Sequence, residues 1–98
     1  MSQTINIQVL NNNTLLKLEL DNESKNNALS ISMLDQLIDV LTDKKIIKNL
    51  KCIIITGAKK GPFCSGADLT DIEKLKKANN MNFYHKKLNY LLNIIKNI

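Results

Sequence analysis

Residue types with special chemistry are scarce in this chain. It has no tryptophan, 4% aromatic residues, one histidine and two cysteines among 98 residues. Two cysteines are too few for a disulfide scaffold, so we expect free thiols in a reducing compartment. Isoleucine and leucine must build the core. A domain of this size hides only roughly two-thirds of its unfolded surface, which predicts a thin core.

Long apolar runs and dense positive charge are also absent. No segment approaches the roughly 20 apolar residues that a membrane span requires, and the chain begins with a strand pattern rather than a secretory signal. We therefore expect a soluble, cytoplasmic protein without a membrane partner. The formal net charge is +5, but no arginine-rich block interleaved with aromatic residues occurs, which argues against nucleic acid as a partner. This mild charge suits a phosphorylated small molecule equally well.

Hydrophobic periodicity predicts an α/β fold in which a hairpin comes first. Apolar residues alternate with polar ones over 5–9 and again over 16–20, as in two strands with one buried face. Ser30 is positioned to cap a helix whose apolar residues follow at helical spacing. Asp35 early in this helix and Lys44 and Lys45 late in it suit the helix dipole.

A continuous apolar run, Cys52–Thr56, predicts a parallel strand that is buried on both faces, Cys52 included. Two helices are expected after it: a short amphipathic segment from Leu69 to Leu75, and a longer helix with an apolar stripe from Tyr84 to Ile98. A strand with two apolar faces requires a neighbour on each edge, and the chain offers few further strands. We expect residues 1–98 to form a single partial domain, with a missing neighbour or one supplied by a partner.

The loop Gly61–Leu69 is the most informative segment. It joins the apolar strand to a helix expected to start near Asp68. A strand that passes through a glycine-rich turn into a helix N-terminus can direct backbone N–H groups at a negative oxygen. The alternative is a tight connection chosen only for packing.

Two stretches together resemble one family. They are Lys25–Ser30, before the first helix, and Thr56–Gly57 with Phe63–Leu69, after the apolar strand. In order, separation and secondary-structure setting they resemble the N-terminal half of the enoyl-CoA hydratase/isomerase (crotonase) superfamily. The resemblance implies a spiral of ββα units, acyl-CoA thioester substrates of fatty-acyl or related metabolism, and no cofactor beyond the coenzyme A of the substrate.

The resemblance also implies site residues. In the family, two backbone N–H groups form an oxyanion hole for the thioester oxygen, and Ala67 matches the first. Small neighbours, Ser65 and Gly66, would let a thioester approach the backbone, and the helix that follows would add partial positive charge. Asp68 and Leu69 would border the acyl channel.

On the coenzyme A side, the resemblance implies that Ala28 and Leu29 line the pocket near the pantetheine and adenine. Lys25 would approach the nucleotide phosphates, although the family's usual Arg-Pro is replaced here by Asn22-Glu23-Ser24. The second oxyanion donor and the catalytic carboxylates would lie beyond the end of this chain. The glutamates at 19, 23 and 73 match none of them. We therefore expect negligible hydratase activity from this chain alone.

Other chemistries fit the residues less well. Cys64 with His85 as base would need an orienting group that the sequence does not suggest, so a packed cysteine is favoured. The three glycines form neither a Walker-type loop nor a G-x-G-x-x-G motif. Asp68, Asp71 and Glu73 are more typical of helix-dipole partners than of metal ligands, so we expect no metal.

The alternative to an enzyme is a non-catalytic binding or assembly module, or a half-enzyme completed by a partner chain or a homo-oligomer. The free strand edge and the stripe on the last helix would pair with that partner. A decayed reading frame is the third possibility, and the nucleotide sequence after Ile98 would test it. The reaction stays open as well, because the family performs hydration, isomerisation and other conversions with one oxygen-binding device.

Overall fold

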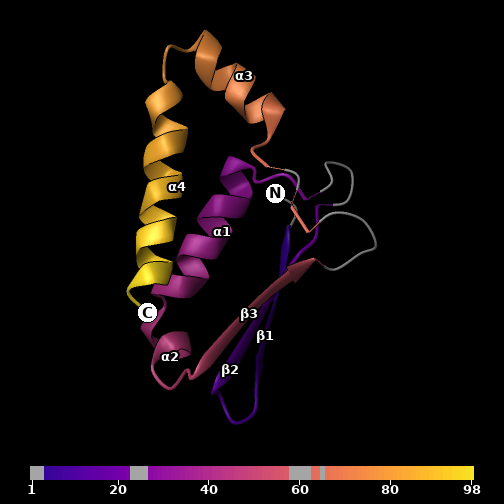
Figure 1. The fold of residues 1–98 in the computed structure, drawn as a ribbon, viewed down its shortest axis with the longest axis vertical. Coiled ribbons are helices and arrows are strands. Elements are labelled where there is room, and N and C mark those ends of the chain that lie inside the picture. Colours follow the sequence, from indigo (N-terminus) through magenta and orange to yellow (C-terminus); the bar gives the residue numbers. More distant parts are fainter. Residues whose placement is uncertain (1–3, 23–26, 58–62, 65) are drawn as a thin grey trace.

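A computed structural model describes residues 4–22, 27–57, 63–64 and 66–98. The elements follow in the order β1 (Ile5–Leu10), β2 (Leu15–Leu20), α1 (Ile31–Thr42), α2 (Lys44–Ile47), β3 (Cys52–Gly57), α3 (Leu69–Lys77) and α4 (Met81–Lys96). In Figure 1, α1 lies between the sheet and α4. The predicted α/β order is confirmed.

The sheet has the order β1-β2-β3. β1 and β2 form the predicted antiparallel hairpin, with Ile5 opposite Leu20. Its turn passes through three asparagines with positive φ, a conformation that asparagine tolerates better than most residues. β3 runs parallel to β2, as predicted, and its last residue, Gly57, lies opposite Leu20.

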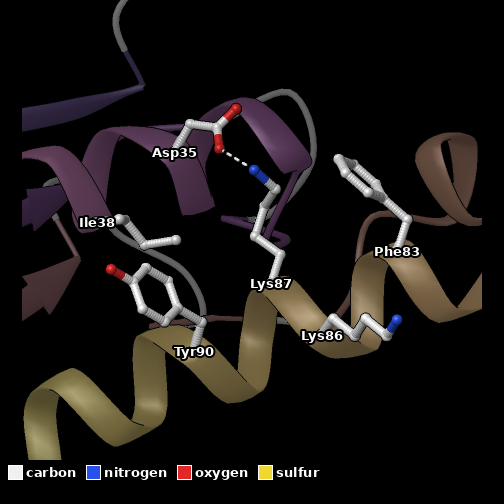
Figure 2. Close-up of a pocket in the computed structure, with 6 residues that line it drawn as sticks. All are labelled: Asp35, Ile38, Phe83, Lys86, Lys87 and Tyr90. Atoms are coloured by element: carbon white, nitrogen blue, oxygen red, sulfur yellow. Dashed lines mark hydrogen bonds and ion pairs between the residues drawn. The ribbon is translucent and has the colours of Figure 1, made fainter.

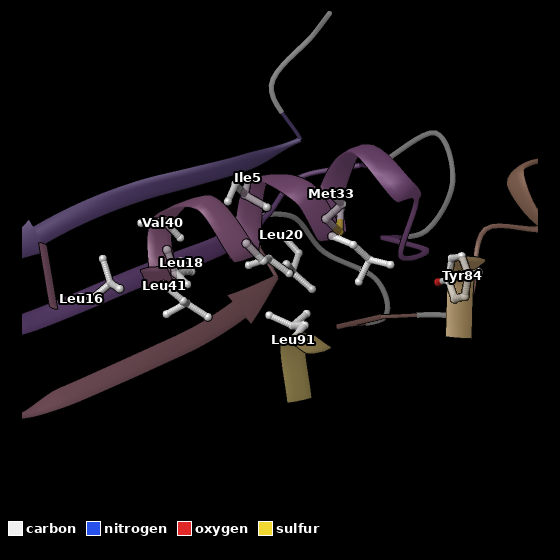
Figure 3. Packing of buried hydrophobic residues seen from close by; sticks show 11 residues of the cluster. Ile5, Leu16, Leu18, Leu20, Met33, Val40, Leu41, Tyr84 and Leu91 are labelled. Carbon is white, nitrogen blue, oxygen red and sulfur yellow. The ribbon is translucent and has the colours of Figure 1, made fainter. Parts of the chain in front are cut away.

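The core lies between the inner face of the sheet and the helices (Figure 3). Three alternating leucines of the central strand, Leu16, Leu18 and Leu20, are at most 2% exposed. They face apolar residues of α1, which begins where the sequence predicts, since the Ser30 Oγ accepts the Met33 N–H at 3.0 Å. The full buried cluster is Ile5, Leu16, Leu18, Leu20, Met33, Leu34, Leu37, Val40, Leu41, Tyr84 and Leu91.

β3 is not covered on both faces, so that expectation was wrong. Cys52 is exposed, and Ile54 on the same outer face is 41% exposed. Only Ile53 and Ile55, on the inner face, pack against the core. Among the described strands β3 has one neighbour, β2, and it therefore forms an edge of the sheet. The apolar composition indicated that a cover is needed but not whether this chain supplies it.

Two details of the helices also differ from expectation. α1 ends at Thr42, and the two lysines expected at its end belong to α2, for which Asp43 accepts the Lys45 N–H at 2.9 Å. On α4, Ile94 rather than Ile95 packs against the core, and Ile95 is 41% exposed. A step of three from Leu91 reaches Ile94 and a step of four reaches Ile95, so spacing alone allowed either.

Candidate functional site

The two family-like stretches meet where β2 and β3 end. Leu20 and Gly57 are paired at the carboxyl ends of these parallel strands, the edge at which ligands bind in open α/β sheets. Beyond this edge, the Leu29 N–H donates to the Gly66 carbonyl at 2.7 Å, and the Asp68 N–H donates to the Leu29 carbonyl at 3.1 Å. Leu29 and Ala67 thereby form a short parallel bridge. The structure brings together residues that are far apart in the sequence.

This bridge determines the direction of the Ala67 N–H. In a trans peptide the carbonyl of one residue and the N–H of the next point in opposite directions, and no described peptide bond is cis. Because the Gly66 carbonyl points at Leu29, the Ala67 N–H points away from it. Ala67 is exposed, and within the described ranges no acceptor takes its N–H. None of the described residues therefore occupies this amide.

Gly66 allows the chain to reach that arrangement. Its φ is +116°, a value that residues with a side chain rarely adopt. A Cβ built on it meets nothing within 4 Å. The requirement for glycine therefore comes from backbone conformation and not from lack of space.

Asp68 begins α3 and is 3% exposed. Its carboxylate accepts the Thr70 N–H at 2.9 Å and the Asp71 N–H at 3.2 Å, which makes it the N-cap of the helix. Its negative charge offsets the partial positive charge of the helix end. The partial positive charge that the helix dipole was expected to add near Ala67 is correspondingly reduced. The Ala67 N–H itself is then the main positive group at this position.

Leu69, the next residue, is 80% exposed. It presents a large apolar side chain to solvent two residues beyond the Ala67 N–H. A backbone donor and an exposed apolar side chain thus lie within two residues of each other in the chain.

The segment that supports Ala67 is held by side chains of two helices, α3 and α4. The Asp71 carboxylate of α3 accepts the Ile31 N–H at 2.7 Å. The Tyr84 hydroxyl of α4 donates to the Leu29 carbonyl at 2.5 Å. Tyr84 is 2% exposed, and burial, followed by the nearby Cys64, Asp68 and Asp71, raises the pKa of its hydroxyl. The phenol therefore keeps its proton and remains a donor at neutral pH.

The turn before Leu29 is held by asparagines. Asn27 has a φ of +58° and is buried. Its Oδ1 accepts the Asn22 N–H at 2.7 Å, and its Nδ2 lies against the end of β3, 3.2 Å from where a Cβ on Gly57 would be. Ala28 is 6% exposed. Lys25 and Ser65, predicted at this site, lie outside the described residues.

Sequence reasoning missed Asn27 and Tyr84. Tyr84 was assigned to an apolar stripe, although a buried tyrosine needs a partner for its hydroxyl, and that requirement was the available signal. Asn27 belonged to a recognised stretch but had no assigned role. Its type was the only hint, since asparagine is enriched at positive φ.

The alternative chemistries gain no support from the described residues. The Cys64 thiol is directed at the Gly66 carbonyl, 3.8 Å away, and not at His85, which is exposed on α4. Among the described residues, no group of three or more potential ligands for a metal ion occurs. The carboxylates nearest in sequence to Ala67, Asp68 and Asp71, both accept backbone amides and are engaged in capping.

A hollow lies between α1 and α4, away from Ala67 (Figure 2). It has a volume of about 390 Å³ and is lined by Asp35, Ile38, Phe83, Lys86, Lys87 and Tyr90. Asp35 is paired with Lys87, whose ammonium lies 5.1 Å from the centre of the Phe83 ring. The carboxylate that lines this groove is thus paired with a lysine.

Comparison with known proteins identifies relatives of the chain. Residues 10–98 match the enoyl-CoA hydratase/isomerase family model. YngF of Bacillus subtilis (strain 168), a protein assigned by name to the enoyl-CoA hydratase/isomerases, is 42% identical over 50 residues, which are 51% of this chain and 19% of YngF.

Solved structures agree. An enoyl-CoA hydratase from Bacillus anthracis has a TM-score of 0.62 at 31% identity, over 81% of this chain and 32% of that one. AtuE of Pseudomonas aeruginosa has a TM-score of 0.82 at 22% identity, over 94% of this chain and 35% of AtuE, a likeness that shows the fold alone. The chain spans about a third of the length of these structures.

None of the helices among the described residues combines the length and the apolar character that a membrane span requires.

Proposed function

The chain belongs to the enoyl-CoA hydratase/isomerase family, and we propose that it binds acyl-CoA thioesters with the Ala67 N–H as an oxyanion donor. One observation carries this proposal: Ala67 is exposed, and its N–H has no acceptor within the described ranges and points away from Leu29, whose N–H holds the Gly66 carbonyl.

In hydration of an enoyl thioester, such a donor would stabilise the enolate intermediate. When hydroxide from water adds to the β-carbon of an enoyl thioester, the electrons of the double bond move onto the thioester oxygen and form an enolate. A fixed N–H directed at that oxygen stabilises the developing charge, and loss of one such donor costs other enzymes about 10²–10³ in rate. The Leu29 N–H and the Cys64 thiol both point at the Gly66 carbonyl of the same peptide, which polarises the Ala67 N–H further.

Residues around the donor supply the rest of the binding surface in this proposal. Leu69 would contact the acyl group, for which its exposed side chain is suited. Ala28 and Leu29 would lie toward the pantetheine and adenine, and Lys25 near the phosphates. Asp68 would contribute by fixing the start of α3 beside the acyl group.

Proton transfer requires a base or acid within reach of the reacting carbon or water. The two carboxylates of the Ala67 segment are occupied by backbone amides. We therefore expect the isolated chain to bind a thioester but to hydrate crotonyl-CoA at a negligible rate. Hydration by the purified chain at a rate typical of enzymes would contradict this.

Binding is best tested at the donor itself. We expect the Ala67 amide resonance of ¹⁵N-labelled chain to move downfield with crotonyl-CoA and not with free coenzyme A, which lacks the thioester oxygen. Ala67→Pro removes the N–H and should weaken crotonyl-CoA binding about two- to tenfold by calorimetry, in line with the loss of one neutral hydrogen bond. Ala67→Gly keeps the N–H and is the matched control. Equal affinity of both variants would refute the donor role.

A second candidate is a half-enzyme or assembly module completed by a partner chain or a second copy. β3 has one neighbour among the described strands, and its outer face exposes Cys52 and Ile54. α4 also exposes apolar side chains beyond the core: Phe83, Tyr90, Leu92 and Ile95, followed by Ile98. Surfaces of this kind are typical of protein interfaces.

Mixing with the remaining part of the Bacillus anthracis hydratase tests this candidate. We expect a 1:1 complex in sedimentation velocity and the appearance of crotonyl-CoA hydration. Ile54→Lys should abolish the complex, whereas Asn6→Lys, on the same outer face but on the far strand, should not. A stable monomer that forms no complex would speak against the module.

A further inference from the structure

Tyr84 makes a hydrogen bond that core packing does not require. It lies on α4, 55 residues along the chain from Leu29, and its hydroxyl reaches the Leu29 carbonyl at 2.5 Å. Its ring is buried to 2% exposure. A phenylalanine would fill the same space, so the hydroxyl has a separate effect.

The carbonyl that Tyr84 holds is the centre of the bridge. It already accepts the Asp68 N–H, and the N–H of the same residue donates to Gly66. The carbonyl would therefore be satisfied without Tyr84. The added donor fixes where Leu29 lies, and Leu29 in turn fixes the peptide that joins Gly66 to Ala67.

We propose that Tyr84 is the positioning residue for the Ala67 donor: its hydroxyl holds the Leu29 carbonyl so that the Ala67 N–H stays directed at the thioester oxygen. This inference rests on the proposed function of Ala67. It assigns to α4 a part in the site that no motif in the loop reveals.

The connection runs through backbone atoms only. Movement of Leu29 would rotate the Gly66 carbonyl, and by planarity of the peptide the Ala67 N–H with it. An N–H that samples several directions binds an oxygen more weakly, because the binding then has to order it. Loss of the hydroxyl should therefore affect the donor more than it affects the fold.

The decisive experiment is NMR of ¹³C,¹⁵N-labelled wild type and Tyr84→Phe. In the variant we expect the Leu29 carbonyl resonance to move upfield, the Ala67 amide resonance to shift, and the Asp68 amide to exchange with solvent about fivefold faster, as expected for loss of one hydrogen bond. Crotonyl-CoA affinity should fall by a similar factor.

Two controls separate positioning from general destabilisation. Tyr90→Phe removes a hydroxyl from the exposed face of the same helix and should change none of these signals. Leu91→Ala removes a buried side chain of α4, should lower the stability of the fold, and should leave the Leu29 carbonyl resonance in place.

The inference and the proposed function fail separately. Unchanged Leu29 and Ala67 resonances in Tyr84→Phe would overturn the inference whether or not a ligand binds. Shifted resonances with unchanged crotonyl-CoA affinity would overturn it as well. Absence of crotonyl-CoA binding by wild type would refute the proposed function, while the resonances of the free chain would still decide whether Tyr84 positions the amide.

Discussion

Removal of the Asp68 cap offers the sharpest test of how the site is held. Asp68→Ala leaves the Thr70 and Asp71 N–H groups without their acceptor at a position that is 3% exposed. Loss of an N-cap costs about 0.5–2 kcal/mol. Because two amides are involved and water replaces the carboxylate poorly at a buried site, we expect the upper half of this range, about 1–2 kcal/mol.

Urea unfolding followed by circular dichroism measures this loss in free energy. In thermal unfolding, each kcal/mol lost should lower the melting temperature by roughly 4–8 °C in a domain of this size. Asp68→Asn retains an acceptor oxygen and should keep most of the stability, since asparagine and aspartate are about equal as N-caps.

Asp43→Ala is the matched control, because Asp43 caps the four-residue helix α2 with one bond and is exposed. We expect it to cost about 0.5 kcal/mol, the lower end of the same range. Equal losses from the two alanine variants would refute the reasoning. A loss from Asp68→Asn as large as that from Asp68→Ala would refute it too.

Three further results are expected. Gly66→Ala should lower the free energy of unfolding by about 1–3 kcal/mol, because the φ of +116° strains any side chain; urea unfolding tests this, and a neutral effect would contradict it. Leu18→Ala, at a fully buried position, should cost about 2–5 kcal/mol, whereas Leu10→Ala, 41% exposed, should cost within about 0.5 kcal/mol. The raised pKa of Tyr84 stabilises the fold fully below the unfolded tyrosine pKa of about 10, and this stabilisation is lost as pH rises through the higher folded pKa. The free energies of unfolding of wild type and Tyr84→Phe, measured from pH 8 to 11, should therefore approach each other above about pH 10. A difference that stays constant over this range would exclude linkage to Tyr84.

The sequence predicted the parts of the fold that depend on neighbouring residues. Strand alternation defined the hairpin, and a polar cap at Ser30 defined where α1 begins. Each of these signals acts within a few residues and needs no tertiary information. The boundary between α1 and α2 also had a local signal, because Asp43 can cap a helix. The helical periodicity through Ile38 and Leu41 instead favoured one longer helix.

The parts that the sequence did not predict depend on distant contacts. Whether the outer face of β3 is covered depends on which other segments pack against it. Its apolar composition shows only that such a cover is needed. The role of Tyr84 depends on a carbonyl 55 residues away. Resemblance to a family implied a donor role for Ala67, but the direction of its N–H follows from pairing with Leu29, for which no side chain is a marker.

When the donor is a backbone N–H, substitution of the donating residue matters less than substitution of the residues that set its direction. The side chain of Ala67 takes no part in directing its N–H, so any small residue at 67 leaves the donor in place. Gly66 has no such freedom, because its φ sets the course of the chain through the bridge. Leu29 acts through its backbone, and its half-buried side chain is constrained mainly by packing against the core. In the proposed site, the direction of the donor would therefore depend on Gly66 and on the residues that hold Leu29, Tyr84 among them, and not on the identity of the residue that donates.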